Sequence, residues 1–486
     1  MKVEGLRYRD EWIPNFYPAR KVAEDNFLRL SRVGSTQILS EAQNAQLDEV
    51  AMDAELFERL ERTCHIITSQ NSAEVFERLE EWHALTYCGP RLHIIVLTKR
   101  CNLNCTYCHM NPEAIGADPA AFDMQPDTMD ATIEFSLSTP SSHIHFEFQG
   151  GEPFLNFEGM KYFVTKAREA NESVGKNLHF SVVSNLMLVK DEHLEFCREQ
   201  GINVSYSLNG PEDLHDLYRK SRTGSGSWRI VMKRLRTLQE RFPGVLSTSP
   251  LCVVGADNAK DLIRTIDFYH EEGFKGVAIL KLKHLGNSVK ENLAFDIDEF
   301  LKYYLAALDH IYYKNIRTGE NYSERHLRVL VAKTMSDRDI GYIDWRNPNG
   351  DFSGAVTIDH DGEILPSDEA RSLRHFWGLG NVKERSYEEL VRDPATLRSM
   401  NLSLRDRDPE CRECAFNPYC GLLPVLDYAR TGDPVPKPHA SEECLQTIAV
   451  LEWLFEKMVE DPLPLFRMLP GMDRHLVKLA ERLEVA

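Results

Sequence analysis

An alternation of short apolar runs and longer amphipathic stretches between residues 92 and 283 constrains the fold more than any other feature of the sequence. Six apolar runs have the length and composition of buried strands: LHIIVLT, IHFEFQGG, LHFSVVSN, INVSYSLNG, TSPLCVV and VAILKLK. The stretches between them, such as FEGMKYFVTKAREANES and AKDLIRTIDFYHEEG, have the spacing of amphipathic helices. This order predicts an α/β fold with a parallel sheet and right-handed crossovers, open or curled into a partial barrel.

The segments on either side of this alternation have different patterns. Residues 1–90 mix short apolar runs with helical spacing, and we expect a small α+β module there. Residues 91–300 contain the alternation, and residues 301–350 read as a helical linker. Residues 351–486 begin with a hairpin-like stretch, GAVTIDHDGEILPSD with HDG as its turn, and end in a helical tail. We therefore expect four parts with these boundaries.

Composition and charge exclude several classes of partner. A hydrophobic content of 42% and a charged content of 27% are typical of a globular protein. The formal net charge of −18 argues against nucleic acid as a partner, because such binding relies on clustered Lys and Arg, and it favours basic or apolar peptides. No stretch approaches the roughly 18 apolar residues of a membrane span, and MKVEGLRYRDEW has no apolar signal core. We expect a cytoplasmic protein that does not bind membranes.

Seven of the 11 cysteines form two groups. In a reducing compartment clustered cysteines more often bind metal than form disulfides. The first group, CxxxCxxC at Cys101, Cys105 and Cys108, follows the first predicted strand, where α/β sheets bind their ligands. Three thiolates suit an iron–sulfur cluster with one iron left for an outside ligand better than structural zinc, which prefers four. The second group consists of Cys411, Cys414, Cys420 and Cys444, which would also satisfy zinc.

The first group resembles the loop of the radical SAM superfamily, CxxxCx(aromatic)C after the first strand of a partial (β/α)6 barrel, with Tyr107 at the aromatic position. Three further motifs resemble this family's binding site for S-adenosylmethionine: QGGEP, SNL and SLNGPEDLHDLYR. The resemblance implies that Glu152 and the preceding turn hold the methionyl amine. The resemblance also implies that SNL and Ser207 contact the ribose of S-adenosylmethionine, and that Arg219 binds its carboxylate. The implied cofactor residues are Tyr107, Gly150, Gly151, Glu152, Ser184, Asn185, Ser207 and Arg219.

The second group, CRECAFNPYC followed by Cys444, resembles the SPASM domain of radical SAM peptide maturases, which binds two auxiliary clusters. This chain departs from that pattern, because Ser367 and Pro424 stand where ligands are expected and residues 346–353 contain no cysteine. The four cysteines that remain imply one fully ligated auxiliary 4Fe-4S cluster. The expected total is two 4Fe-4S clusters, one on each cysteine group.

Two longer stretches, residues 341–373 and 414–433, resemble His-Xaa-Ser system maturases and related cyclophane-forming enzymes. This resemblance implies a ribosomally made precursor peptide as substrate and a ring closed between a side chain and a β-carbon. Such an oxidation needs a proton acceptor, for which we consider Asp344, Asp359, Asp368 and Glu369, and an electron donor such as flavodoxin or ferredoxin. Lys281, Lys283 and His284 are candidates to face the substrate. The N-terminal module is a candidate for leader-peptide recognition or a plain scaffold.

Two alternatives stay open at this point. An anaerobic sulfatase-maturase-like oxidase has a similar domain order, although the missing inner-cluster ligands argue against it. A peptide-binding scaffold with structural zinc in both cysteine groups would have no catalytic activity. The incomplete first group and the GGEP and SNL motifs argue against the scaffold.

Overall fold

The computed structural model describes residues 6–86, 88–293, 295–336 and 339–469. All six predicted strands are present, and each pairs with its neighbours in parallel. They are β8 (Leu92–Thr98), β11 (His143–Gly150), β12 (Asn177–Ser184), β13 (Ile202–Tyr206), β14 (Leu251–Val254) and β15 (Gly276–Lys281). The strand–helix alternation therefore predicted the six strands and their parallel pairing, but the strands divide between two sheets: β8, β11, β12 and β13 in one, and β14 and β15 in the other.

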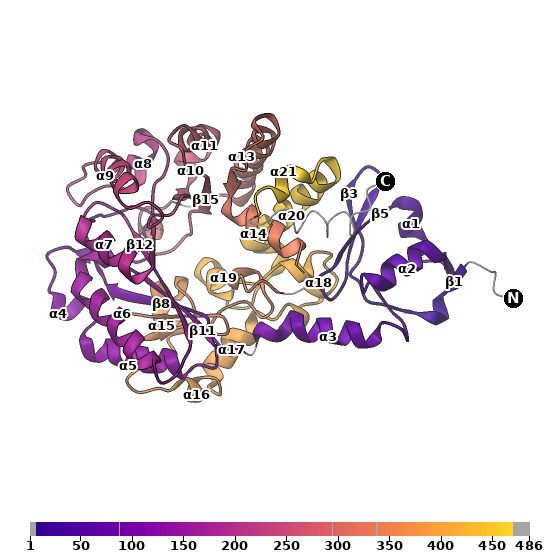
Figure 1. Cartoon of the computed structure of the whole chain (residues 1–486), viewed down its shortest axis with the longest axis horizontal. Helices are drawn as coiled ribbons and strands as arrows, with labels where there is room; N and C mark the ends of the chain where they lie inside the picture. The colour runs from indigo at the N-terminus through magenta and orange to yellow at the C-terminus, as the bar shows by residue number, and fades with distance from the viewer. Residues whose placement is uncertain (1–5, 87, 294, 337–338, 470–486) are drawn as a thin grey trace.

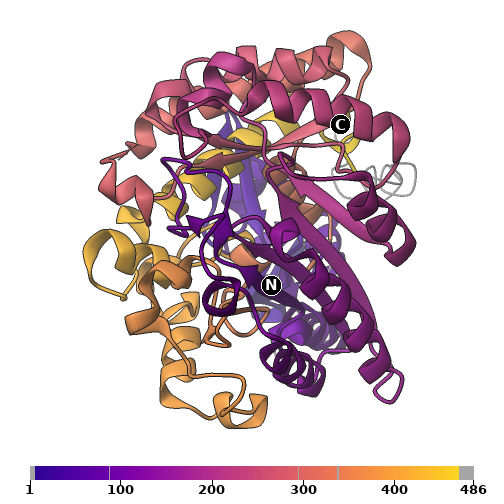
Figure 2. The same cartoon turned by 90° about the vertical axis from the view of Figure 1, so that its left-hand side faces the viewer.

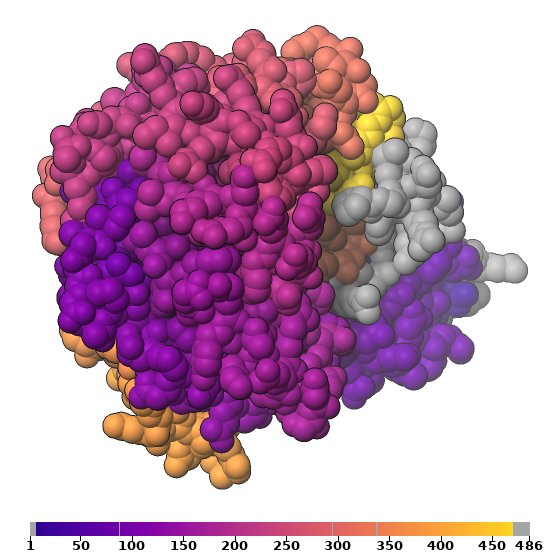
Figure 3. Space-filling view, turned by 60° about the vertical axis from the view of Figure 1, so that its left-hand side comes forward, coloured from indigo at the N-terminus to yellow at the C-terminus, as the bar shows by residue number. Residues whose placement is uncertain are grey.

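Amphipathic helices join these strands and cover their outer side (Figure 1). They are α5 (Pro126–Ser138), α6 (Phe157–Asn171), α7 (Asp191–Gln200), α8 (Glu212–Tyr218), α9 (Trp228–Arg241) and α11 (Leu262–Glu271). The interface is aromatic: the Phe163 ring of α6 lies 5.1 and 5.4 Å from the rings of Phe146 and Phe148 on β11. In Figure 3 the residues of this helical layer form a continuous outer surface.

The main sheet also includes two strands beyond the strand–helix alternation, β17 (Ala355–Ile358) and β18 (Ile364–Leu365). They form the predicted hairpin and are antiparallel, and β17 pairs in parallel with β8. The main sheet is therefore mixed, with the order β13-β12-β11-β8-β17-β18. A second sheet, β14-β15-β16, includes β16 (Ser323–Glu324) from the expected linker. Two parallel bridges, Val204–Leu246 and Ser207–Leu251, connect the chain around β13 to the start of β14.

The N-terminal residues form an α+β module at the opposite end of the molecule from α5–α9 (Figure 1). It contains the antiparallel sheet β3-β4-β5 and helices α1 (Glu41–Gln46), α2 (Ala54–Arg62) and α3 (Ser72–His83). Two short antiparallel pairs complete it: β1 (Leu6–Tyr8) with β6 (Ala51–Asp53), and β2 (Ile13–Pro14) with β7 (Ile66–Ile67). The sheet consists of β3 (Arg20–Ala23), β4 (Asn26–Leu30) and β5 (Thr36–Ser40). Part of the module has its own core around Leu39, Leu56 and Leu60, while Leu28, Leu30 and Trp82 belong to the main core. Figure 2, viewed from the helical layer, shows this module behind the strands.

Helices dominate the remainder of the chain. They include α13 (Ile297–Thr318), α14 (Arg325–Thr334), α18 (Pro409–Arg412), α19 (Pro424–Thr431) and α20 (Glu442–Glu460). Helix α20 packs against α13, α14 and strand β3, so it connects the sheet region with the N-terminal module. Within the described part of the chain, no helix combines the length and the apolar character that a membrane crossing requires.

Candidate functional site

The first cysteine group lies in the loop that follows β8, as the sequence predicts. Cys101 and Cys105 are buried and Cys108 is partly exposed. Backbone hydrogen bonds fix the loop: Cys108 N donates to the Cys105 carbonyl (3.1 Å), and Asn287 N donates to the Cys108 carbonyl (2.8 Å). Gly286 approaches so closely that an added Cβ would lie 2.4 Å from the His109 carbonyl oxygen. The segment after β15 therefore forms one wall of the cysteine loop.

Glu152 occupies the centre of the predicted S-adenosylmethionine site. Its buried carboxylate accepts hydrogen bonds from Ser184 Oγ (2.8 Å) and from the Asn185 backbone N–H (2.8 Å). Burial raises the pKa of Glu152 to about 7 despite these hydrogen bonds. A carboxylate in this state gains from a nearby cation, so the site suits an ammonium group. The structure thus uses the Ser184 hydroxyl to orient Glu152.

The other predicted cofactor residues gather around the same loop. Asn185 Nδ2 donates to Asn102 Oδ1 (2.9 Å) beside Cys101, and Ser207 N donates to the Ser184 carbonyl (3.3 Å). Gly150 has a φ of +132°, and a Cβ there would lie 2.2 Å from the Thr98 carbonyl oxygen. At Gly151 the corresponding distance, to the Arg100 carbonyl oxygen, is 2.1 Å. Both glycines are therefore required for the turn to approach the chain just after β8.

Arg219 places a buried cation next to the cysteines. Its Nη1 donates to the Tyr107 hydroxyl (2.6 Å), and burial raises the pKa of Tyr107 to about 12. Burial also raises the pKa of the Cys105 thiol, while the Arg219 charge lowers it. Arg219 Nε is buried and has no hydrogen-bond partner among the described residues. The site therefore keeps an unused donor suited to an anionic ligand such as a carboxylate.

The second cysteine group comes together from two separate segments. Cys411, Cys414 and Cys420 lie on and after α18, while Cys444 lies in the first turn of α20. Burial and then the charges of the other three thiols raise the pKa of Cys444 above its usual range. Burial raises the pKa of Cys411 to about 12. The fold thus brings Cys444 to the other three cysteines, although it lies 24 positions after Cys420 in the sequence.

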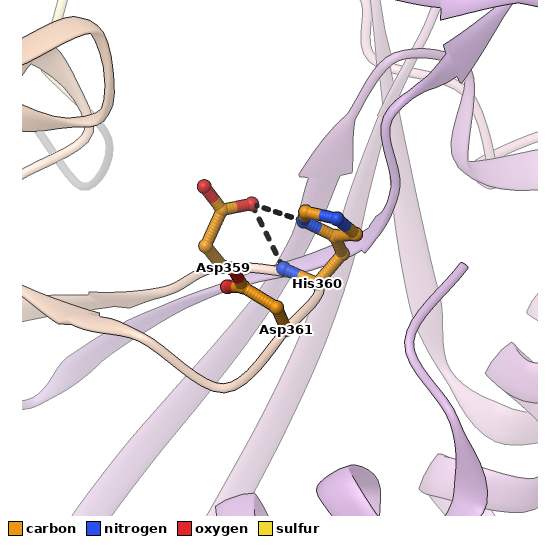
Figure 4. Close-up of side chains that lie close together, drawn as sticks. All are labelled: Asp359, His360 and Asp361. Carbon is orange, nitrogen blue, oxygen red and sulfur yellow. Dashed lines mark hydrogen bonds and ion pairs between the residues drawn. The ribbon is translucent and has the colours of Figure 1, made fainter. Parts of the chain in front are cut away.

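Outside the two cysteine groups, Asp359, His360 and Asp361 bring three possible metal-ligand atoms within 4.8 Å of one another. The Asp359–His360–Asp361 group itself is already engaged with protein groups (Figure 4). Asp359 Oδ1 accepts hydrogen bonds from the His360 backbone N–H (2.8 Å) and pairs with His360 Nδ1 (3.0 Å). Arg374 lies 3.6 Å from the Asp359 carboxylate and 2.7 Å from that of Asp361. Burial alone would raise the pKa of Asp359, but Arg371 and His360 hold this pKa well below its usual range. We therefore read this cluster as an ion-pair network of the hairpin turn.

The predicted acidic pair, Asp368 and Glu369, lies against the first cysteine loop. His109 Nε2 is 2.8 Å from Asp368 Oδ2, and Arg371 Nη1 donates to Asp368 Oδ1 (3.2 Å). Despite burial, the contacts with His109 and Arg371 hold the pKa of Asp368 well below its usual range. Glu369 pairs with Lys283, which lowers the pKa of Glu369 despite burial. Both carboxylates are ionised and engaged with cations.

Asp344 has a different environment, in a cavity of about 630 Å³. Burial, and then the charge of Glu369, raises its pKa above the usual carboxyl range. Among the described residues no hydrogen bond or ion pair engages its carboxylate. The cavity also contains the predicted substrate-facing residues Lys281, Lys283 and His284, of which Lys281 pairs with Glu442 (2.8 Å). Asp344 therefore combines access to the cavity with a raised pKa, although the charges of Lys283, His326 and Arg325 oppose the shift.

Several residues of the site lack a signal in the sequence. Asp351 is buried with Oδ2 unpartnered among the described residues, and its pKa is raised by burial and by Glu369 and Asp344. Arg405 is buried beside the second cysteine group, where its charge lowers the pKa of Cys420 against the effect of burial. His109, which pairs with Asp368, was not predicted either, although its position next to Cys108 could have indicated it. The other two belong to irregular segments without a recognisable pattern.

Comparisons with known proteins agree with this geometry. Residues 95–269 match the Radical SAM superfamily. The cysteine-type anaerobic sulfatase-maturating enzyme of Clostridium perfringens is 24% identical over 338 residues, 68% of this chain and 88% of that protein. The structure of native anSMEcpe with bound AdoMet superposes with a TM-score of 0.64 at 19% identity, covering 76% of this chain and 98% of that one.

A second structural likeness is to Streptococcus suis SuiB bound to the precursor peptide SuiA. Its TM-score is 0.51 at 14% identity, with 88% of this chain and 98% of that chain covered. At these identities the two superpositions show the fold alone. The sequence match adds what the fold alone does not show: residues 95–269 match the radical SAM family, so this part of the chain is a radical SAM domain, and the protein is an enzyme.

Proposed function

We propose that the protein is a maturase that oxidatively crosslinks side chains of a ribosomally made precursor peptide. The observation that carries this proposal is the position of the cavity around Asp344. The segment after β15, which contacts the Cys108 loop, lines this cavity, and so does the first part of α20, the helix that contains Cys444. A peptide in this cavity would lie between the two cysteine groups.

The proposal includes the finer features implied by the resemblance. The strands β8 and β11–β15 would form the partial (β/α)6 barrel, and residues 351–486 a SPASM-like domain with one auxiliary cluster. Cys101, Cys105 and Cys108 would hold the first 4Fe-4S cluster, and Cys411, Cys414, Cys420 and Cys444 the second. When bound, the first cluster and S-adenosylmethionine supply a 5'-deoxyadenosyl radical, and the auxiliary cluster supplies an electron acceptor.

A ring closure of this kind removes two hydrogens from the peptide. One leaves the β-carbon as a hydrogen atom and ends in 5'-deoxyadenosine. The other leaves the attacked side chain as a proton while one electron departs, so the new bond forms with atoms and charge balanced. The chain must therefore provide a proton acceptor in the cavity.

Asp344 is the acceptor that we favour among the predicted carboxylates. Asp368 and Glu369 are each paired with cations, which weakens them as bases. Asp344 lines the cavity and has a raised pKa, which brings its proton affinity closer to working pH. Tyr342 and Trp345, whose rings lie 4.9 Å apart in the same wall, would pack against the peptide.

The remaining parts of the proposal concern partners and location. Flavodoxin or ferredoxin would deliver the electron that starts the reaction, and the enzyme would work in the cytoplasm. The substrate would be a small precursor peptide of the His-Xaa-Ser or a related crosslinking system. Support comes from SuiB, which has a similar fold and binds a precursor peptide.

The test combines metal analysis with product analysis. After anaerobic reconstitution we expect about eight irons per chain, cleavage of S-adenosylmethionine, and a candidate peptide that loses two hydrogens. Tandem mass spectrometry would show no fragments inside the ring. The candidate peptides are the short peptides encoded by neighbouring genes. Zinc in place of iron, or cofactor cleavage without a change in any of these peptides, would contradict the proposal.

Oxidation of one protein side chain, as by sulfatase maturases, is a second candidate. The match to the Clostridium perfringens enzyme over 88% of its length favours it. An aldehyde product would react with hydroxylamine and fragment normally, whereas a crosslinked peptide would do neither. The same peptide assay therefore separates the two functions.

A further inference from the structure

The N-terminal module contacts the second cysteine group through buried polar side chains. The Tyr17 hydroxyl, just before β3, donates to Asn417 Oδ1 (3.0 Å). Asn417 Nδ2 in turn donates to the Cys411 carbonyl (2.8 Å). All three residues are buried. One amide side chain thus connects a tyrosine of the module to the backbone of a cysteine in the loop.

A second connection lies close to the first in the same loop. Tyr419, fully buried, directly precedes Cys420, and its hydroxyl donates to the Gly34 carbonyl (2.8 Å) and lies 2.8 Å from Thr36 Oγ1. Gly34 has a φ of +79°, and a Cβ there would lie 2.1 Å from the Trp82 ring. The turn that receives Tyr419 is therefore fixed by close packing under α3.

The same interface carries charged groups. Arg20 on β3 pairs with Glu452 on α20, and its guanidinium lies 5.9 Å from the Phe416 ring. Phe416 directly precedes Asn417, so the module contacts the loop at Phe416, Asn417 and Tyr419. Removing a buried partner here would leave a polar group unsatisfied, and such a loss weakens the contact between the module and the loop.

We propose that the N-terminal module forms a wall of the auxiliary cluster site, with Tyr17, Thr36 and Tyr419 as positioning residues for the cysteine loop. The inference rests on the proposed function in that it requires a cluster on Cys411, Cys414, Cys420 and Cys444. Solvent access and hydrogen bonding control the lability and potential of such a cluster. The module therefore has a role in the chemistry that is separate from any recognition of a leader peptide.

The test uses the full chain in the Cys101/Cys105/Cys108 triple alanine background, so that all iron reports on the auxiliary site. Tyr419→Phe removes one hydroxyl and keeps the ring. We expect the variant to release iron to a chelator several-fold faster, with a changed electron paramagnetic resonance spectrum and midpoint potential. Tyr17→Phe should have the same effects, smaller in size.

Asp53→Ala is the matched control within the module. Asp53 Oδ1 caps α2 by accepting the Leu56 N–H (2.8 Å), so its loss destabilises the module at a site separate from the contacts with Asn417 and Tyr419. We expect unchanged iron release, spectrum and potential. Equal effects of Asp53→Ala and Tyr419→Phe, or no effect of Tyr419→Phe, would overturn the inference while leaving the two-cluster proposal intact. Absence of iron from the triple alanine protein itself would instead overturn the auxiliary cluster, and the inference with it.

Discussion

The two cysteine groups have the same kind of ligand but opposite surroundings. Around Cys101, Cys105 and Cys108 the fold places ionisable and amide side chains, and Arg219 Nε stays without a partner among the described residues. Around the second group, Asn417 and Tyr419 are hydrogen-bonded to the N-terminal module. The first group keeps a buried donor available for a polar ligand. The second is held by contacts with the N-terminal module, although Cys414 and Cys420 stay partly exposed. Under the proposed function, the first group would be the site of bond cleavage and the second a site of electron transfer or structure.

Removal of the first cysteine group should have the largest effect. Alanine at Cys101, Cys105 and Cys108 removes all ligands to the first cluster, so cleavage of S-adenosylmethionine should cease. About four of about eight irons should remain. Alanine at Cys411, Cys414 and Cys420 should instead preserve cofactor cleavage and stop peptide crosslinking. Measured 5'-deoxyadenosine from the first variant would contradict the assignment of the two roles.

Substitution of the proton acceptor should affect the peptide reaction alone. Asp344→Asn should lower crosslinking by about 100-fold or more, because general bases typically contribute roughly 10²–10⁴-fold. Cofactor cleavage should continue. Glu443→Gln changes another carboxylate of the same cavity and should alter the rate no more than a few-fold. Similar losses in both variants would remove the special role of Asp344.

The pH dependence should have a definite sign. A base acts when deprotonated, so crosslinking per cofactor cleaved should fall as the pH drops through the pKa of Asp344. Burial raises this pKa, so the fall should occur above the usual carboxyl range. A single-turnover pH profile with peptide measures it. A rate that rises toward acid pH would be inconsistent with a carboxylate acceptor.

Glu152→Gln should weaken the cofactor site without removing the cluster. The amide cannot offer a negative charge to an ammonium, and a hydrogen bond to a charged group is worth about 1.5–3 kcal/mol. We expect roughly 10- to 100-fold weaker binding of S-adenosylmethionine in equilibrium titrations with iron content unchanged. Ser184→Ala removes the hydrogen bond to Glu152 and the acceptor of the Leu186 N–H (3.0 Å) but keeps the carboxylate charge, so it should have a smaller effect. The reverse order of the two effects would show that Glu152 acts indirectly.

Arg405→Gln should produce the smallest change, in the auxiliary cluster. A buried cation favours the more negative reduced state, so its loss should lower the midpoint potential. The expected shift is at most about 59 mV, a tenfold change in a one-electron equilibrium constant. Arg405→Lys keeps the charge and serves as the control. A potential unchanged in the glutamine variant would mean that this cation does not tune the cluster.

The sequence predicted those parts of the fold and site that depend on local patterns. All six central strands and the hairpin at GAVTIDHDGEILPSD form where periodicity and turn residues indicated. The pairing of β17 with β8 had no such signal in the sequence. These two strands are more than 250 residues apart, and they meet only after the intervening chain has folded. Likewise, the proton affinity of Asp344 depends on burial and on Glu369, which is 25 residues away in the sequence. The position of Asp344 in the sequence therefore did not make it a better candidate for the proton acceptor than Asp368 or Glu369.

By itself the sequence determined the ligand types and the order of the strands: it contains two cysteine groups, the motifs around Glu152, Asn185 and Arg219, and the six apolar runs. These features are local, since each motif lies within a short stretch of sequence. The tertiary structure alone decided what surrounds each group. Contacts such as Tyr17–Asn417, separated by 400 residues, arise only when distant segments pack. The environment that separates the two sites is therefore a property of the folded chain.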